Sequence, residues 1–205
     1  MTLDGLRPLA EKGLSPFVRA ADGLGLSPDG VSALAFVCAV AAGVAFGLAP
    51  PAEAPLFYVA GSALVFANGW LDLVDGALAR AQGTDSSGGD LLDHVLDRYA
   101  DIAVIVGLAA GIGRYGLGLA AVTGVLMTSY LGTQIQAVGI GREYGGLLGR
   151  ADRLALVGLV GVVAAAVPRP LVAGLGAVGL LLALFAVVGH LTAIQRFWGA
   201  WSDLN

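Results

Sequence analysis

Long uncharged, apolar stretches dominate this chain. Residues 31–50 and 115–141 contain no Asp, Glu, Lys or Arg, and residues 170–195 are interrupted only by His190. A helix that crosses a bilayer needs about 20 mostly apolar residues. We therefore predict an all-α, polytopic membrane protein with six transmembrane helices. They fall at about 31–50, 54–80, 90–113, 115–141, 154–168 and 170–195.

The composition excludes several other classes. Of the 205 residues, 57% are hydrophobic and only 13% are charged, which a disordered chain would not show. Cys38 is the only cysteine, so an intrachain disulfide framework is excluded. The net charge of −4 argues against nucleic acid as a partner, because such a surface would be basic.

The basic residues predict the orientation. With six spans, every Lys and Arg except Arg114 and Arg169 falls on one side of the membrane. Basic residues are enriched on the cytoplasmic side of membrane proteins. We expect a multi-pass protein of the cell membrane with both termini and the basic face in the cytoplasm.

Residues 1–30 have a different pattern. Their larger apolar residues recur near a 3.6-residue period with charges on the other face, which predicts an amphipathic helix lying on the cytoplasmic leaflet. A plain helical tail is the alternative. We divide the chain into residues 1–30, this helix and the loop after it, and residues 31–205, the six-helix transmembrane domain.

An acidic cluster lies where the second predicted span ends and the third begins. Asp72 and Asp75 are three residues apart, and Asp93 and Asp97 are four apart, so each pair shares a helix face. The glycine-containing connection predicts two adjacent, antiparallel helices on which the four carboxylates converge. Charged side chains are costly within a membrane, and we expect only Arg80 and Arg98 close enough to neutralise these acids.

This deficit of positive charge predicts bound divalent metal. Ligands that are all oxygen favour Mg²⁺ or Mn²⁺ over zinc, and two such ions held by shared carboxylates promote phosphoryl transfer. Gly76 allows a ligand to approach the backbone, and Arg80 can pair with a phosphate. The residues alone thus predict a metal-dependent reaction on a phosphorylated substrate. Acids that pair with arginines or face water are the structural alternative.

The spacing of this cluster resembles a known signature. The pattern D-x2-D-G-x2-A-R-x8-G-x3-D-x3-D is typical of the CDP-alcohol phosphatidyltransferases. The chain matches each fixed position with Asp72, Asp75, Gly76, Ala79, Arg80, Gly89, Asp93 and Asp97. Members of this family have six transmembrane helices and an N-terminal surface helix.

The resemblance implies a role for each of these residues. Asp72, Asp75, Asp93 and Asp97 would hold two Mg²⁺ or Mn²⁺ ions, and Asp97 would take the proton from the acceptor hydroxyl. That hydroxyl would attack the β-phosphorus of a CDP-linked lipid and release CMP. The contacts to the CDP group would be Pro28, Asp29, Gly30, Val31, Gly76, Ala79, Arg80 and Ser86.

Four arginines predict the acceptor. Arg142, Arg150, Arg153 and Arg196 lie near the cytoplasmic face and could bind the phosphate of a phosphorylated polyol, although they also fit a topology signal. The segments around them are similar to the phosphatidylinositol-phosphate synthase branch, which implies inositol phosphate. That branch carries basic residues after a Ser-Tyr pair, whereas Gly132 and Gln134 follow Ser129 and Tyr130 here. Glycerol phosphate is therefore an alternative acceptor.

Two more distant functions fit some features. An intramembrane prenyltransferase also uses acidic pairs to hold Mg²⁺, but it is usually longer and lacks the Gly-x2-Ala-Arg sequence. An ion transporter would place its acids near the midplane, usually with repeat symmetry. Glycine-rich helix faces suit a homodimer or close packing within one bundle.

Overall fold

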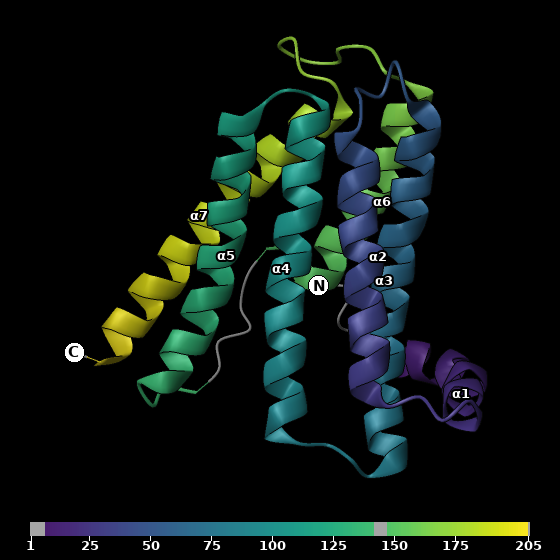
Figure 1. The fold of residues 1–205 in the computed structure, drawn as a ribbon. Helices are drawn as coiled ribbons and strands as arrows, with labels where there is room; N and C mark the ends of the chain where they lie inside the picture. The colour runs from purple at the N-terminus through teal and green to yellow at the C-terminus, as the bar shows by residue number, and fades with distance from the viewer. Residues whose placement is uncertain (1–6, 142–146, 205) are drawn as a thin grey trace.

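The computed structural model describes residues 7–141 and 147–204, and these residues form seven α-helices (Figure 1). The all-α class is confirmed. The helices are α1 (Arg7–Gly23), α2 (Pro28–Gly47), α3 (Pro55–Gln82), α4 (Ser87–Gly111), α5 (Tyr115–Ala137), α6 (Arg150–Ala166) and α7 (Ala177–Leu204).

The chain is a membrane protein by the length and composition of its helices. Among the described residues, α2, α3, α5 and α7 are long and apolar enough to cross a bilayer. The other two helices of the bundle are α6, which has 17 residues, and α4, which begins with the acidic segment. The number of six spans therefore stays a prediction, although helices α2 to α7 all run along the bundle (Figure 1).

Serine caps fix the start of the two helices that border the acidic cluster. Ser27 accepts a hydrogen bond from the Gly30 N–H at the start of α2, and Ser86 accepts one from the Gly89 N–H at the start of α4. Such caps satisfy N–H groups that the helix itself leaves unpaired. Gly83 ends α3 in the left-handed conformation, so the chain turns within a few residues into α4.

The packing order of the helices corrects one expectation. Within the described residues, α3 and α4 run antiparallel but do not pack directly on each other, because α2 packs against both. Gly43 on α2 and Gly107 on α4 allow this approach, since a side chain on either would overlap the backbone of the other helix. The carboxylates of α3 and α4 therefore face each other across a gap between the two helices.

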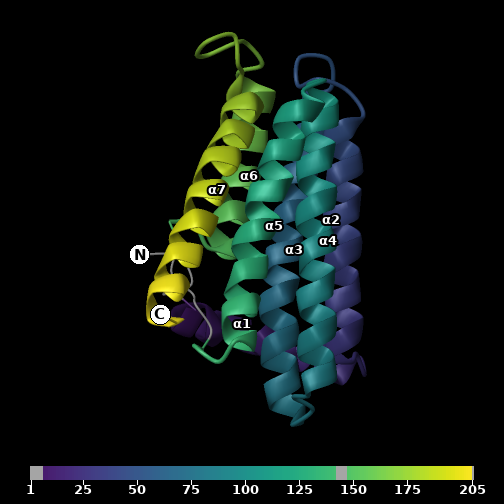
Figure 2. The ribbon, with the colours of Figure 1, turned by 90° about the vertical axis from the view of Figure 1, so that its left-hand side faces the viewer.

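The remaining helices complete the bundle around α2, α3 and α4. Helix α6 packs on α3, while α5 and α7 form a pair that contacts α4 (Figures 1 and 2). Helix α1 crosses the lower end of the bundle in Figure 2, and its Leu14 and Ala21 are buried against Val31, Val74 and Leu78. A helix is thus present in the N-terminal segment as predicted, and its position on the cytoplasmic leaflet stays a prediction.

Candidate active site

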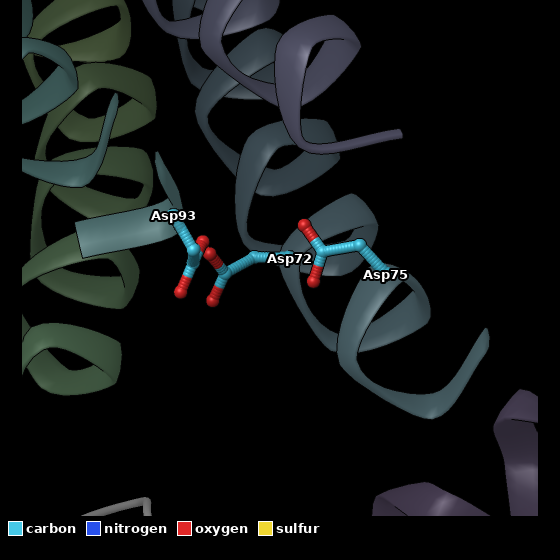
Figure 3. A group of neighbouring side chains, drawn as sticks. All are labelled: Asp72, Asp75 and Asp93. Atoms are coloured by element: carbon cyan, nitrogen blue, oxygen red, sulfur yellow. The ribbon is translucent and has the colours of Figure 1, made fainter. Parts of the chain in front are cut away.

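Three carboxylates come together from two helices. Asp72 and Asp75 on α3 and Asp93 on α4 each offer an oxygen, and these atoms lie within 4.8 Å of one another (Figure 3). Oxygen ligands at this spacing fit Mg²⁺ or Mn²⁺. The sequence-based expectation that α3 and α4 bring acids together is thus confirmed for these three residues.

Helix α2 orients the cluster from a third side. The Ser32 hydroxyl donates a hydrogen bond of 2.6 Å to Oδ2 of Asp75, and both residues are buried. Further along, the Asn68 amide donates to the Ala35 carbonyl over 2.9 Å and joins α3 to α2. Ser32 was not foreseen, because nothing in the spacing of a lone serine shows which helix it faces.

Arg150 at the start of α6 pairs with two acids at once. Its Nη1 lies 2.8 Å from Oδ1 of Asp72, and its Nη2 lies 2.6 Å from Oδ1 of Asp97. The expectation that only Arg80 and Arg98 lie near enough to neutralise the acids is therefore wrong. Asp97, predicted as a metal ligand and base, is bound to a guanidinium in this structure.

A second ion-pair layer lies one turn deeper. Asp101 and Arg153 are both buried, with exposed fractions of 6% and 7%, and their side chains meet over 3.1 Å. Arg98 lies 3.8 Å from Asp101 and 3.5 Å from Asp97, and it also donates to Ser129 on α5. This layer joins α4, α5 and α6 beneath the acidic cluster. Asp101 was not foreseen, because it lies outside the signature.

A polar cavity of about 720 Å³ opens beside the carboxylates. Its lining includes Asp75 and Asp93, and most residues assigned to the CDP group. These are Pro28, Asp29, Gly76, Ala79, Arg80 and Ser86. Val31 instead is buried among side chains of α1 and α3, and the Gly30 N–H is taken up by Ser27.

The three predicted acceptor arginines that the structure describes do not share one space. Arg150 and Arg153 lie at or below the carboxylates, whereas Arg196 on α7 donates a 2.6 Å hydrogen bond to the Thr128 carbonyl on α5. Arg196 also lines a separate cavity of about 200 Å³. Arg142 lies outside the described residues.

The fold and the site together define a helical membrane protein with a candidate cation site open to a polar cavity. Comparison with known proteins identifies its family. Residues 26–201 match the model of the CDP-alcohol phosphatidyltransferases, and the chain belongs to this family.

Named relatives cover nearly the whole chain. It is 32% identical over 207 residues to the archaetidylinositol phosphate synthase of Methanothermobacter thermautotrophicus, covering 99% of this chain and 96% of that one. It is also 32% identical over 196 residues to the phosphatidylinositol phosphate synthase of Mycobacterium tuberculosis strain H37Rv, with coverage of 92% and 86%.

Two solved structures of the Mycobacterium tuberculosis phosphatidylinositol phosphate synthase are also similar, each at 28% identity. The structure with CDP-DAG bound has a TM-score of 0.75 and covers 92% of this chain and 93% of that one. The complex with manganese and citrate has a TM-score of 0.77, with coverage of 92% and 88%. These likenesses confirm the resemblance drawn from the signature.

Proposed function

We propose that this enzyme transfers the phosphatidyl or archaetidyl group of a CDP-linked lipid to a hydroxyl of inositol phosphate and releases CMP. The observation that carries the proposal is a group of three carboxylates, two of which, Asp75 and Asp93, line a cavity large enough for a nucleotide headgroup. The named relatives support the acceptor, since both are inositol phosphate lipid synthases.

In this proposal, the large cavity holds the CDP group and Asp72, Asp75, Asp93 and Asp97 hold two Mg²⁺ or Mn²⁺ ions. The ions, when bound, neutralise the phosphate oxygens and stabilise the leaving group. Arg80 pairs with a phosphate, and Gly76 lets the headgroup approach the α3 backbone. Ser32 keeps the Asp75 carboxylate turned toward its neighbours.

Asp97 acts as the base. It takes the proton from the acceptor hydroxyl, whose oxygen forms the new ester bond to the β-phosphorus. The bond between that phosphorus and the bridging oxygen breaks, and its electron pair leaves with CMP. A positioned carboxylate in this role contributes about 10²–10⁴-fold to a rate.

The acceptor phosphate is assigned to the arginines around the cluster. Arg150 on α6 pairs with Asp72 and Asp97, and Arg153 one turn further along α6 pairs with Asp101. Arg98 adds a cation beside Ser129, where the α5 positions Gly132 and Gln134 are neutral. Arg142 and Arg196 complete the set predicted from the sequence. Glycerol phosphate remains the second candidate acceptor, because it offers the same phosphate chemistry.

The proposed setting is the cell membrane, crossed several times, with both termini and the cavity facing the cytoplasm. A homodimer is the proposed assembly, supported only by the glycine-rich helix faces of the sequence.

The test incubates purified protein with a CDP-linked lipid, Mn²⁺ and one acceptor at a time, and measures CMP release. We expect release with inositol phosphate and little with glycerol phosphate, free inositol or serine. Diacylglycerol and archaeol forms of the CDP-lipid are run in parallel to identify the lipid. Release with glycerol phosphate alone would replace the acceptor, and release with none of them would overturn the proposal.

A further inference from the structure

Arg150 occupies two carboxylates that the proposed function assigns to metal ions. Its guanidinium lies 2.8 Å from Asp72 and 2.6 Å from Asp97, and its side chain is only 15% exposed. Asp72 also belongs to the group of three acids that could hold a cation. One side chain from α6 thus closes over acids from both α3 and α4.

The position of Arg150 in the fold allows its side chain to move away from the two carboxylates. It is the first residue of α6, where the Gly149 N–H donates a 2.8 Å hydrogen bond to Asp152 Oδ2. This capping interaction fixes the helix start without using the Arg150 side chain. A long side chain at a capped helix start can change rotamer while the helix stays in place.

The Arg150 guanidinium and a bound metal ion would compete for the same carboxylates because both are positively charged. A guanidinium and a divalent ion have the same sign, so both on the same carboxylate oxygens repel strongly in a partly buried site. While Arg150 holds Oδ1 of Asp97, a hydroxyl can approach that carboxylate only at its remaining lone pairs. Loading the site for catalysis therefore conflicts with the pairing in this structure.

We propose that binding of a divalent cation displaces the Arg150 side chain from Asp72 and Asp97. In the metal-free enzyme it balances Asp72 and Asp97, and it releases them when a divalent cation binds. The freed guanidinium then becomes available to the acceptor phosphate, so that the acceptor site forms only after the metal site is loaded. This inference rests on the proposed function and adds an order of binding to it.

Removal of Arg150 would change Mn²⁺ affinity in opposite directions under the two possible roles of this residue. If Arg150 competes with the cation, its removal strengthens Mn²⁺ binding. If Arg150 instead stays in place and orients the ligands, its removal weakens Mn²⁺ binding, as the loss of a supporting hydrogen bond usually does.

The experiment measures Mn²⁺ affinity by calorimetry on the purified protein without CDP-lipid. It compares the wild type with Arg150→Gln, Arg150→Lys and, as a control with the same loss of charge, the exposed Arg114→Gln at the far end of the bundle. We expect Arg150→Gln to bind Mn²⁺ on the order of tenfold more tightly. Arg150→Lys lies between, since an ammonium cannot span both carboxylates, and Arg114→Gln matches the wild type.

A second titration measures inositol phosphate binding with and without Mn²⁺. In the wild type, Mn²⁺ should strengthen this binding, and in Arg150→Gln the strengthening should be lost. Unchanged or weaker Mn²⁺ binding by Arg150→Gln overturns the inference. If the glutamine variant does not fold, unchanged or weaker Mn²⁺ binding by Arg150→Lys overturns it equally. Failure of the wild type to bind Mn²⁺ would instead overturn the metal site on which the proposed function depends.

Discussion

A hydrogen bond from α2 contributes to the orientation of the Asp75 carboxylate. Ser32 donates to it over 2.6 Å in a buried setting, and the same hydroxyl lies 3.1 Å from the Pro28 carbonyl of its own helix. A carboxylate that loses such a partner must either rotate or remain partly unsatisfied. Ser32 therefore affects the orientation of a carboxylate in the cluster, although it is not itself an acidic residue.

Replacement of Ser32 by Ala should weaken Mn²⁺ binding about tenfold, because groups that support metal ligands usually have effects of about 10–100-fold. Calorimetry on the purified variant measures this change. Thr133→Ala is the control, since Thr133 is exposed and its hydroxyl donates to the Tyr130 carbonyl of its own helix. Equal Mn²⁺ affinity in the two variants would show that Ser32 does not orient Asp75.

Asp97→Asn tests the proposed base. The amide keeps the shape of the side chain but cannot take a proton from the acceptor, so CMP release should fall at least about 100-fold. The unfolding midpoint in detergent should stay close to that of the wild type. Glu53→Gln, in the exposed connection between α2 and α3, removes one negative charge far from the site as a control. Near-normal CMP release by Asp97→Asn would remove its assigned role.

The candidate site could be predicted only as far as local spacing reaches. Asp72 and Asp75 share a face of one helix and Asp93 lies in the second turn of the next, so their meeting follows from helix geometry and the short connection. Ser32 and Arg150 come from helices distant in sequence, and no periodicity shows where they dock. The contact between Arg150 and Asp97 is visible only in the folded molecule.

At the scale of elements, the sequence predicted the helices better than their packing. The apolar stretches located all six bundle helices, and the amphipathic pattern located α1. The short turn after Gly83 suggested that α3 and α4 pack together, but α2 lies against both. The separation of α3 and α4 has a physical reason, because their backbones in direct contact would leave no room for the carboxylates between them.

The contact between Gly43 and Gly107 should be sensitive to one added methyl group. In Gly107→Ala the new Cβ would overlap the Gly43 carbonyl and push α2 away from α4, at a cost of about 1–3 kcal/mol. The unfolding midpoint in detergent should fall. The control is Gly199→Ala on α7, where the new Cβ meets open space and alanine favours the helix. A midpoint for Gly107→Ala as high as that of the control would contradict this packing.

The whole molecule places its chemistry at one end of the bundle. The turn between α3 and α4, helix α1 and the C-terminal end of α7 lie at the lower end in Figure 1, and the connection between α2 and α3 lies at the upper end. Arg80 lies in the last turn of α3 at the lower end, whereas Arg114 immediately precedes α5 at the other end. The positive-inside bias predicts that the lower end, with the cavity, faces the cytoplasm.

Cysteine accessibility tests this orientation, because Cys38 is the only native cysteine. In a Cys38→Ala background, Ser202→Cys near the end of α7 and Glu53→Cys between α2 and α3 each add one thiol at an exposed position. A membrane-impermeant maleimide applied to intact cells should label Glu53→Cys only, and inverted vesicles should give the opposite result. Labelling of both thiols from the same side would mean an even number of spans between them, and reversed labelling would place the cavity outside the cytoplasm. The first result would contradict six spans, and the second would separate the site from a cytoplasmic supply of CDP-lipid and acceptor.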